Sequence, residues 1–324
     1  MPVTGLAADA RVQKHDPGPD HPEQPARYDA VVNGLERAGL LAKLLRLDAR
    51  SATDDELALV HTRDYIALVE AEVTGRRKQL STGDTDIGPF SAEAARLATG
   101  CVLSAVDVIF SGAVENAFCA VRPPGHHASA ARGMGFCLFN NIAVAARYAQ
   151  RRHGIERVLI ADWDVHHGNG TQDIFYEDGS VLFFSTHQAP WYPGTGAAFE
   201  RGEGVGAGKT INCPFAAGSG AAEIVGAFRD LLVPAAEAFR PDLVLISAGF
   251  DSRRNDPLGQ FLLSDEDFGD LTGIVMEIAA RHAKGRVVSV LEGGYSLDGL
   301  ANATAAHVAR LMEVVKHPYF TPKI

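Results

Sequence analysis

One stretch of the chain, residues 157–170, constrains its fold more than any other. It opens with the apolar run Val-Leu-Ile-Ala, which predicts a strand buried in a parallel sheet. Asp162, Asp164 and His166 follow at alternate positions, and in an extended chain such residues project to one side. The stretch therefore predicts an α/β chain with two carboxylates and an imidazole at the carboxyl end of a strand, where open α/β sheets bind ligands.

Aspartate oxygens and a histidine nitrogen suit Zn²⁺ or a related divalent ion. A polar strand end with satisfied hydrogen bonds would have the same short motif, so the motif alone leaves both interpretations open. The metal-binding interpretation is favoured by three other predicted strands, because each is followed by further polar side chains. These are His126 and His127 after strand 117–121, Asp251 after strand 242–247, and Tyr295 after strand 286–291.

The carboxyl ends of parallel strands share one edge of a sheet, so these side chains are expected in one cleft. Asp164, His166 and Asp251 would give a zinc ion three ligands and leave positions open for catalysis. His126 and His127 are candidates for the general base and acid, and the Tyr295 hydroxyl is a candidate donor to an oxyanion. Together they form a complete set for hydrolysing an amide.

The order of elements predicts a single α/β domain over residues 1–324, with a mostly parallel central sheet flanked by helices. Residues 316–324, which include Pro318 and Pro322, are expected to be a peripheral tail. Ser91 is predicted to cap a long helix, and Asn140 or Asn141 the next one. Pro234 predicts a break in the helix that begins near residue 221.

Composition limits the classes of function. A net charge of −10 argues against a nucleic-acid-binding protein and mildly favours a cationic substrate. No apolar run is long enough to span a membrane, and the start of the chain lacks the pattern of a secretion signal. Four scattered cysteines fit a reducing compartment. We therefore expect a cytoplasmic protein, with homo-oligomer formation left open.

For three residues the sequence leaves alternatives open. Asp84 and Asp86 lie in a polar loop and could be solvated or could contact substrate at the rim of a site. Arg27 could be a surface charge or the partner of a buried anion.

Several motifs resemble the zinc-dependent histone deacetylase superfamily. They are Arg-Pro-Pro-Gly-His-His at 122–127, Gly-Met-Gly-Phe-Cys at 133–137, Asp-Trp-Asp-Val-His-His-Gly-Asn-Gly at 162–170, Gly-Phe-Asp-Ser at 249–252 and Glu-Gly-Gly-Tyr at 292–295. Trp163 and Asn169 resemble the class II and bacterial members, which include histone deacetylase-like amidohydrolases and acetylpolyamine amidohydrolases.

The resemblance implies the arginase–deacetylase fold, one zinc ion per chain and a structural potassium ion against Asp162 and Ser185. Asp162 and Asn169 would stand behind the paired histidines, and Arg27 would lie near an internal acetate cavity. The implied substrate tunnel is lined by Gly135, Phe136, Tyr192, Leu258 and Gly294.

Two positions depart from the family's pattern, and a third bears on the choice of substrate. Asn169 replaces the aspartate of class I members, which would make the histidine that it contacts less basic. Tyr192 replaces the usual phenylalanine and adds a hydroxyl that needs a partner. The resemblance places Leu258 at the tunnel mouth. At the same place, the family's polyamine-preferring vertebrate member is expected to carry a glutamate that acts as a gatekeeper.

The predicted function is hydrolysis of acetyl-lysine or a related acylamide, a small acylated amine, in preference to acetylpolyamines. An acetylpolyamine amidohydrolase is the main alternative. A manganese ureohydrolase and a non-catalytic binding protein are further alternatives, although the first would need an Asp-x-Asp where this chain has only Asp251.

Overall fold

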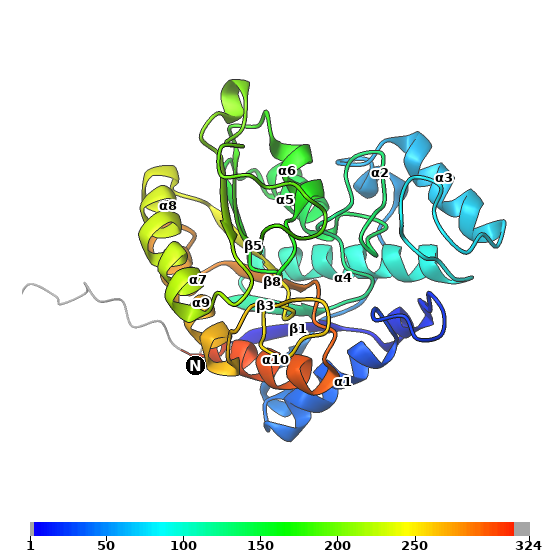
Figure 1. The fold of residues 1–324 in the computed structure, drawn as a ribbon, viewed down its shortest axis with the longest axis horizontal. Helices are drawn as coiled ribbons and strands as arrows, with labels where there is room; N and C mark the ends of the chain where they lie inside the picture. Colours follow the sequence, from blue (N-terminus) through cyan, green and yellow to red (C-terminus); the bar gives the residue numbers. More distant parts are fainter. Residues whose placement is uncertain (1–2, 314–324) are drawn as a thin grey trace, which may run out of the picture.

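The protein is described by a computed structural model that places residues 3–313, and the predicted tail at 316–324 lies outside this range. Within it, eight strands form one sheet in the order β2-β1-β3-β8-β7-β4-β5-β6, and every neighbouring pair is parallel. Helices cover both faces of the sheet (Figure 1). The predicted α/β architecture is confirmed.

The strands are β1 (Thr4–Ala8), β2 (Leu45–Arg46), β3 (Asn116–Ala120), β4 (Val158–Asp162), β5 (Val181–Gln188), β6 (Thr210–Phe215), β7 (Leu243–Ala248) and β8 (Val287–Leu291). The α-helices are α1 (Ala26–Arg37), α2 (Asp54–Leu57), α3 (Arg63–Thr74), α4 (Ser91–Phe110), α5 (Asn141–His153), α6 (Asn169–Phe175), α7 (Ala221–Ala227), α8 (Val233–Phe239), α9 (Asp265–His282) and α10 (Leu297–Leu311).

Alternating side chains of the strands build two cores, one on each face of the sheet. In β4, Leu159 and Ala161 pack in the core that contains residues of α1 and α7 to α10. Val158 and Ile160 belong to the opposite core, with residues of α4, α5 and α6. Burial on both faces explains why β4 reads as a continuous apolar run rather than an alternating one.

The helix boundaries test the predicted caps. Asn140 caps α5, since its side chain accepts a hydrogen bond from the backbone of Ala143. The prediction for Ser91 is wrong: Phe90 precedes the helix, and Ser91 is its first residue. The Ser91 hydroxyl accepts from the backbone N–H of Gly88 and lies 2.7 Å from His15 Nδ1, so it satisfies the loop before the helix. The break before Pro234 is confirmed as a π-helical turn between α7 and α8.

The topology explains why the predicted site residues meet. β3, β8, β7 and β4 are consecutive in the sheet, and they are the four strands whose carboxyl ends precede those residues. The edge strand β6 was not predicted from the sequence, because Asn212 and Pro214 interrupt its apolar pattern. Among residues 3–313, no helix has both the length and the apolar character needed to cross a membrane.

Candidate metal centre and active site

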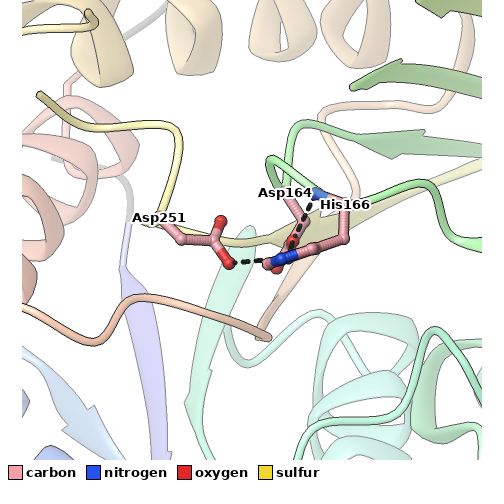
Figure 2. Close-up of side chains that lie close together, drawn as sticks. All are labelled: Asp164, His166 and Asp251. Atoms are coloured by element: carbon pink, nitrogen blue, oxygen red, sulfur yellow. Dashed lines mark hydrogen bonds and ion pairs between the residues drawn. The ribbon is translucent and has the colours of Figure 1, made fainter. Parts of the chain in front are cut away.

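Asp164, His166 and Asp251 form a compact cluster of metal-binding side chains. One donor atom from each lies within 4.8 Å of the others, and all three residues are buried. Figure 2 shows them converging from the segments that follow β4 and β7. No other such group occurs in the part of the chain that the structure describes. The three predicted ligands are therefore brought together.

The donor set fits a divalent cation. His166 Nδ1 lies 2.9 Å from Asp164 Oδ1 and 3.2 Å from Asp251 Oδ2. One imidazole nitrogen carries at most one hydrogen and cannot serve two carboxylate oxygens. Asp251 Oδ2 accordingly has no hydrogen-bond partner among the described residues, although it is buried. A cation at this point would satisfy it, and mixed aspartate and histidine ligands suit zinc.

Backbone groups hold the two carboxylates in place. The N–H of Val165 donates to Asp251 Oδ1 at 2.9 Å, and the N–H of Gly293 donates to Asp164 Oδ2 at 2.8 Å. A Cβ at position 293 would lie 2.0 Å from Asp251 Oδ2, so only glycine fits there. The glycine that follows β8 is thus required by the close approach of its backbone to the cluster.

The pKa values of the cluster residues show that their surroundings favour bound protons when no metal is present. Burial and the neighbouring Asp164 raise the pKa of Asp251 to about 7. Against its burial, the carboxylates of Asp164 and Asp251 raise the pKa of His166 to about 10. Without a metal the cluster therefore retains protons. A divalent cation would displace them, because metal ligands bind in their deprotonated forms.

The two adjacent histidines differ in their partners. His126 Nδ1 lies 3.0 Å from Asp162 Oδ2, whereas His127 Nδ1 lies 2.8 Å from the neutral Asn169 Oδ1. Although burial favours the neutral ring, Asp162 and Asp164 raise the pKa of His126 to about 10. Burial and the neighbouring imidazole of His126 instead hold the pKa of His127 well below its usual range. The surroundings therefore favour the charged form of His126 and the neutral form of His127.

A cavity of about 400 Å³ opens beside the cluster. Its lining includes Asp84, His127, Gly135, Phe136, His166, Trp191, Tyr192, Leu258 and Tyr295. The Tyr295 hydroxyl makes no hydrogen bond with the side chains or backbone described, and Arg27 lies over its ring at 4.9 Å from the centroid. The hydroxyl is therefore free to donate to a bound molecule.

The rim of this cavity contains a carboxylate that links its two sides. Asp84 accepts hydrogen bonds from the backbone N–H of Gly135 at 2.8 Å and from the Tyr192 hydroxyl at 3.0 Å. Tyr192 thereby finds the partner that its extra hydroxyl needs. Asp84 is exposed and lines the cavity, and its contact with a substrate stays a prediction. Asp86 is partly buried and lies 3.8 Å from His21.

Arg27 is fully buried, which settles the alternative left open for it. Its guanidinium donates to the backbone oxygens of Glu292 at 2.6 Å and Gly294 at 2.7 Å, and to Glu23 Oε1 at 3.0 Å. Arg122 also binds Glu23, through two contacts of 2.6 Å. The anion that Arg27 pairs with in this structure is thus a carboxylate of the protein itself.

The remaining predicted residues lie next to the site rather than on the cavity wall. Gly294 turns its carbonyl to Arg27. Asp162 and Ser185 are register partners on β4 and β5, and the Ser185 hydroxyl lies 3.0 Å from His187 Nδ1.

Two buried carboxylates were missed from the sequence. Glu292 accepts from the backbone of Gly125 at 2.6 Å and of His126 at 3.1 Å, so it fixes the turn that carries the histidines. Asp256 accepts from the backbone of Leu258 and Tyr295. The position of Glu292 at the end of a strand, directly before a glycine pair, was a usable signal; Asp256 in its polar loop gave none.

Comparison with known proteins identifies the family. The Histone deacetylase domain matches residues 21–311. The chain is 44% identical over 303 residues to the human protein named Polyamine deacetylase HDAC10, covering 90% of this chain and 44% of that protein. It is 42% identical over 277 residues to the Pseudomonas aeruginosa Histone deacetylase-like amidohydrolase, covering 85% of this chain and 73% of that one.

A solved structure supports the same conclusion. The crystal structure of the HDA15 HD domain superposes with a TM-score of 0.91 at 40% identity, covering 96% of this chain and 90% of that chain. The chain spans less than half the length of the human relative, so the match concerns only part of that protein. On these matches, together with the fold and the cluster beside the cavity, the chain belongs to the histone deacetylase family.

Proposed function

We propose that the chain is a zinc-dependent amidohydrolase that removes the acyl group from an acylated amine, such as acetyl-lysine or a related acylamide. One observation carries the proposal: His166 of the metal-binding cluster, His127 and Tyr295 all line the same cavity. Ligands, a proton-transfer group and a hydroxyl donor thus face one reacting centre, as amide hydrolysis requires. The names of relatives as deacetylases and amidohydrolases point the same way.

Asp164, His166 and Asp251 would hold the zinc ion. When bound, it supplies the polarisation of the scissile carbonyl and a water molecule whose pKa is lowered to roughly 7. The side chains of the protein would carry out proton transfer and stabilise the developing negative charge.

His127 lines the cavity and accepts the proton of the attacking water, and the histidine pair returns a proton to the leaving amine nitrogen. Asp162 and Asn169 orient the two rings through Nδ1, which leaves each Nε2 for proton transfer. Tyr295 donates its hydroxyl to the oxygen that becomes negative as the carbonyl is attacked.

The acyl group and the stem that carries it would enter between Phe136 and Tyr192. Asp84 binds the backbone N–H of Gly135, next to Phe136, and the Tyr192 hydroxyl. Both rings line the cavity, and their apolar faces suit an aliphatic stem. Arg27 beneath Tyr295 would lie near the released acetate. The potassium ion at Asp162 and Ser185, homo-oligomer formation and a cytoplasmic location stay predictions.

An acetylpolyamine substrate is the second candidate. Asp84 at the rim favours it, since it has no cationic partner among the described residues and a distal ammonium group could pair with it. The human relative named as a polyamine deacetylase favours it as well. Leu258 argues in the other direction, because a leucine at the cavity rim gives such an ammonium no partner.

The test combines metal content with turnover. The purified protein should contain one zinc ion per chain and hydrolyse an acetyl-lysine peptide with a higher kcat/KM than acetylspermidine. Asp251→Ala should lose both the zinc and the turnover of either substrate. Two metal ions per chain would favour the ureohydrolase alternative, and stoichiometric zinc with full turnover in Asp251→Ala would contradict the proposed ligand set.

A further inference from the structure

Asp256 occupies an unusual position between two walls of the cavity. It lies in the loop between β7 and α9 and is only 7% exposed. Its side chain is directed to backbone N–H groups: Oδ1 accepts from Leu258 at 3.0 Å, and Oδ2 accepts from Tyr295 at 2.7 Å and Ser296 at 3.0 Å. One carboxylate therefore binds two segments that are distant in sequence.

Both segments contribute to the cavity. Leu258 and Tyr295 line it, and the carbonyl of Leu258 accepts a hydrogen bond from Trp191 Nε1 at 2.9 Å. Hydrogen bonds thus run without a gap from Trp191 through Leu258 and Asp256 to Tyr295. A shift of the Asp256 side chain would therefore move both Leu258 in the cavity wall and the backbone of Tyr295.

The other contacts of Tyr295 do not replace this one. Arg27 stacks on its ring and binds the carbonyl of the preceding Gly294, but only Asp256 is seen to bind its backbone N–H among the described groups. Gly294 has φ 117°, in a region that glycine adopts freely, so it restrains the next residue only weakly. The position of the Tyr295 backbone therefore depends on an acceptor outside its own segment.

We propose that Asp256 is a positioning residue, which sets the Tyr295 hydroxyl for the chemical step and couples it to the Leu258 wall of the cavity. This inference rests on the proposed role of Tyr295 as the oxyanion donor. A carboxylate suits the task because it accepts at both oxygens, whereas an amide would turn a donor toward one of the N–H groups.

A simpler role has to be separated from this one. Ser296 precedes α10, so Asp256 could act only as a cap that stabilises the start of that helix. A cap alone predicts lower stability with an unchanged chemical step. Asp267 provides the matched control, since its carboxylate accepts from the backbone N–H of Ser264 at 2.7 Å at the start of α9, away from the cavity.

The experiment is a double-mutant cycle on the zinc-loaded enzyme, with an acetyl-lysine peptide and acetylspermidine as probes. Asp256→Ala should lower kcat by about tenfold to a hundredfold, in line with the cost of misplacing a catalytic group by about 1 Å. Added to Tyr295→Phe, the same change should lower kcat by less than about threefold, because the hydroxyl to be positioned is already gone. Asp267→Ala should leave kcat within about twofold of the wild type, as expected for a cap remote from the chemistry.

Asp256→Asn extends the test should the alanine variant fail to fold. This variant should keep the metal but have a lower kcat. It should also change the ratio of the kcat/KM values for the two probes, because the backbone N–H of one wall loses its acceptor. Wild-type kcat in a folded Asp256 variant would overturn the inference. Equal losses in the presence and absence of the Tyr295 hydroxyl would overturn it too, as would failure of both Asp256 variants to fold. Wild-type turnover by Tyr295→Phe would instead refute the proposed function of Tyr295, and this inference with it.

Discussion

Replacing Glu23 by glutamine should destabilise the protein far more than removing a typical ion pair. The Glu23 side chain is fully buried and lies 3.0 Å from Arg27 and 2.6 Å from Arg122, both of them fully buried as well. Despite the burial, Arg122, His15 and Arg27 hold the pKa of Glu23 well below its ordinary value. Glutamine would leave two buried guanidinium groups without a countercharge.

The expected cost is about 3–5 kcal/mol, the range for breaking a buried ion pair by removing one partner. Glu93→Gln is the control, because Glu93 pairs with Lys14 at 2.9 Å and both side chains are about half exposed. An exposed pair contributes roughly 0–1 kcal/mol. Urea unfolding of the zinc-loaded proteins, followed by far-UV circular dichroism, compares the midpoints and slopes of the three proteins.

The pH dependence gives a second readout with a defined sign. Since the folded pKa of Glu23 is lower than the ordinary value of 4.5, its contribution to stability is complete above that value and is lost as the pH falls toward the folded pKa. The difference between wild type and Glu23→Gln should therefore be constant near neutral pH and shrink as the pH falls below that ordinary value of 4.5. A loss no larger than that of Glu93→Gln at neutral pH would refute the reasoning.

Three further predictions concern the site. Tyr295→Phe should lower kcat by on the order of 10²–10³ with zinc still bound, as for loss of an oxyanion donor, and an effect confined to KM would indicate substrate binding instead. Leu258→Glu should raise kcat/KM for acetylspermidine by about fivefold, the equivalent of about 1 kcal/mol for a partly exposed charge pair, and no gain would refute its role as a gatekeeper. Removal of the metal with a chelator should abolish turnover and lower Tm, and added zinc should restore both; activity that survives complete removal would contradict a metal-dependent reaction.

The sheet and the residues at its edge could be predicted because their signals are local. The run before Asp162 is apolar on both faces, as a central parallel strand must be. Asp164 and His166 follow at alternate positions, although the strand itself ends at Asp162 and both lie in a bend. Tyr295 and Asp251 could be added because parallel strands end at the same edge. In the structure these residues come together around one cluster and one cavity.

Interactions between distant segments could not be predicted from the sequence. Asp84 and Asp256 read as ordinary loop carboxylates, since their partners are backbone N–H groups 51 and 39 residues away. The role of Glu23 was not predicted, because its contact with Arg122 spans 99 residues. Ser91 was assigned wrongly because a local rule for helix caps took no account of its contact with His15.

The Glu-Gly-Gly-Tyr segment after β8 has a consequence for how such an enzyme can change in evolution. Its four consecutive residues bind, in order, the turn of His126, the proposed ligand Asp164, Arg27 and Asp256. A substitution or insertion here would disturb ligation, proton transfer and the hydroxyl donor simultaneously, so few single mutations can be tolerated. Substrate preference can change instead through substitutions in the loops of the rim. Their side chains can be replaced one at a time without altering the residues proposed to carry out the reaction.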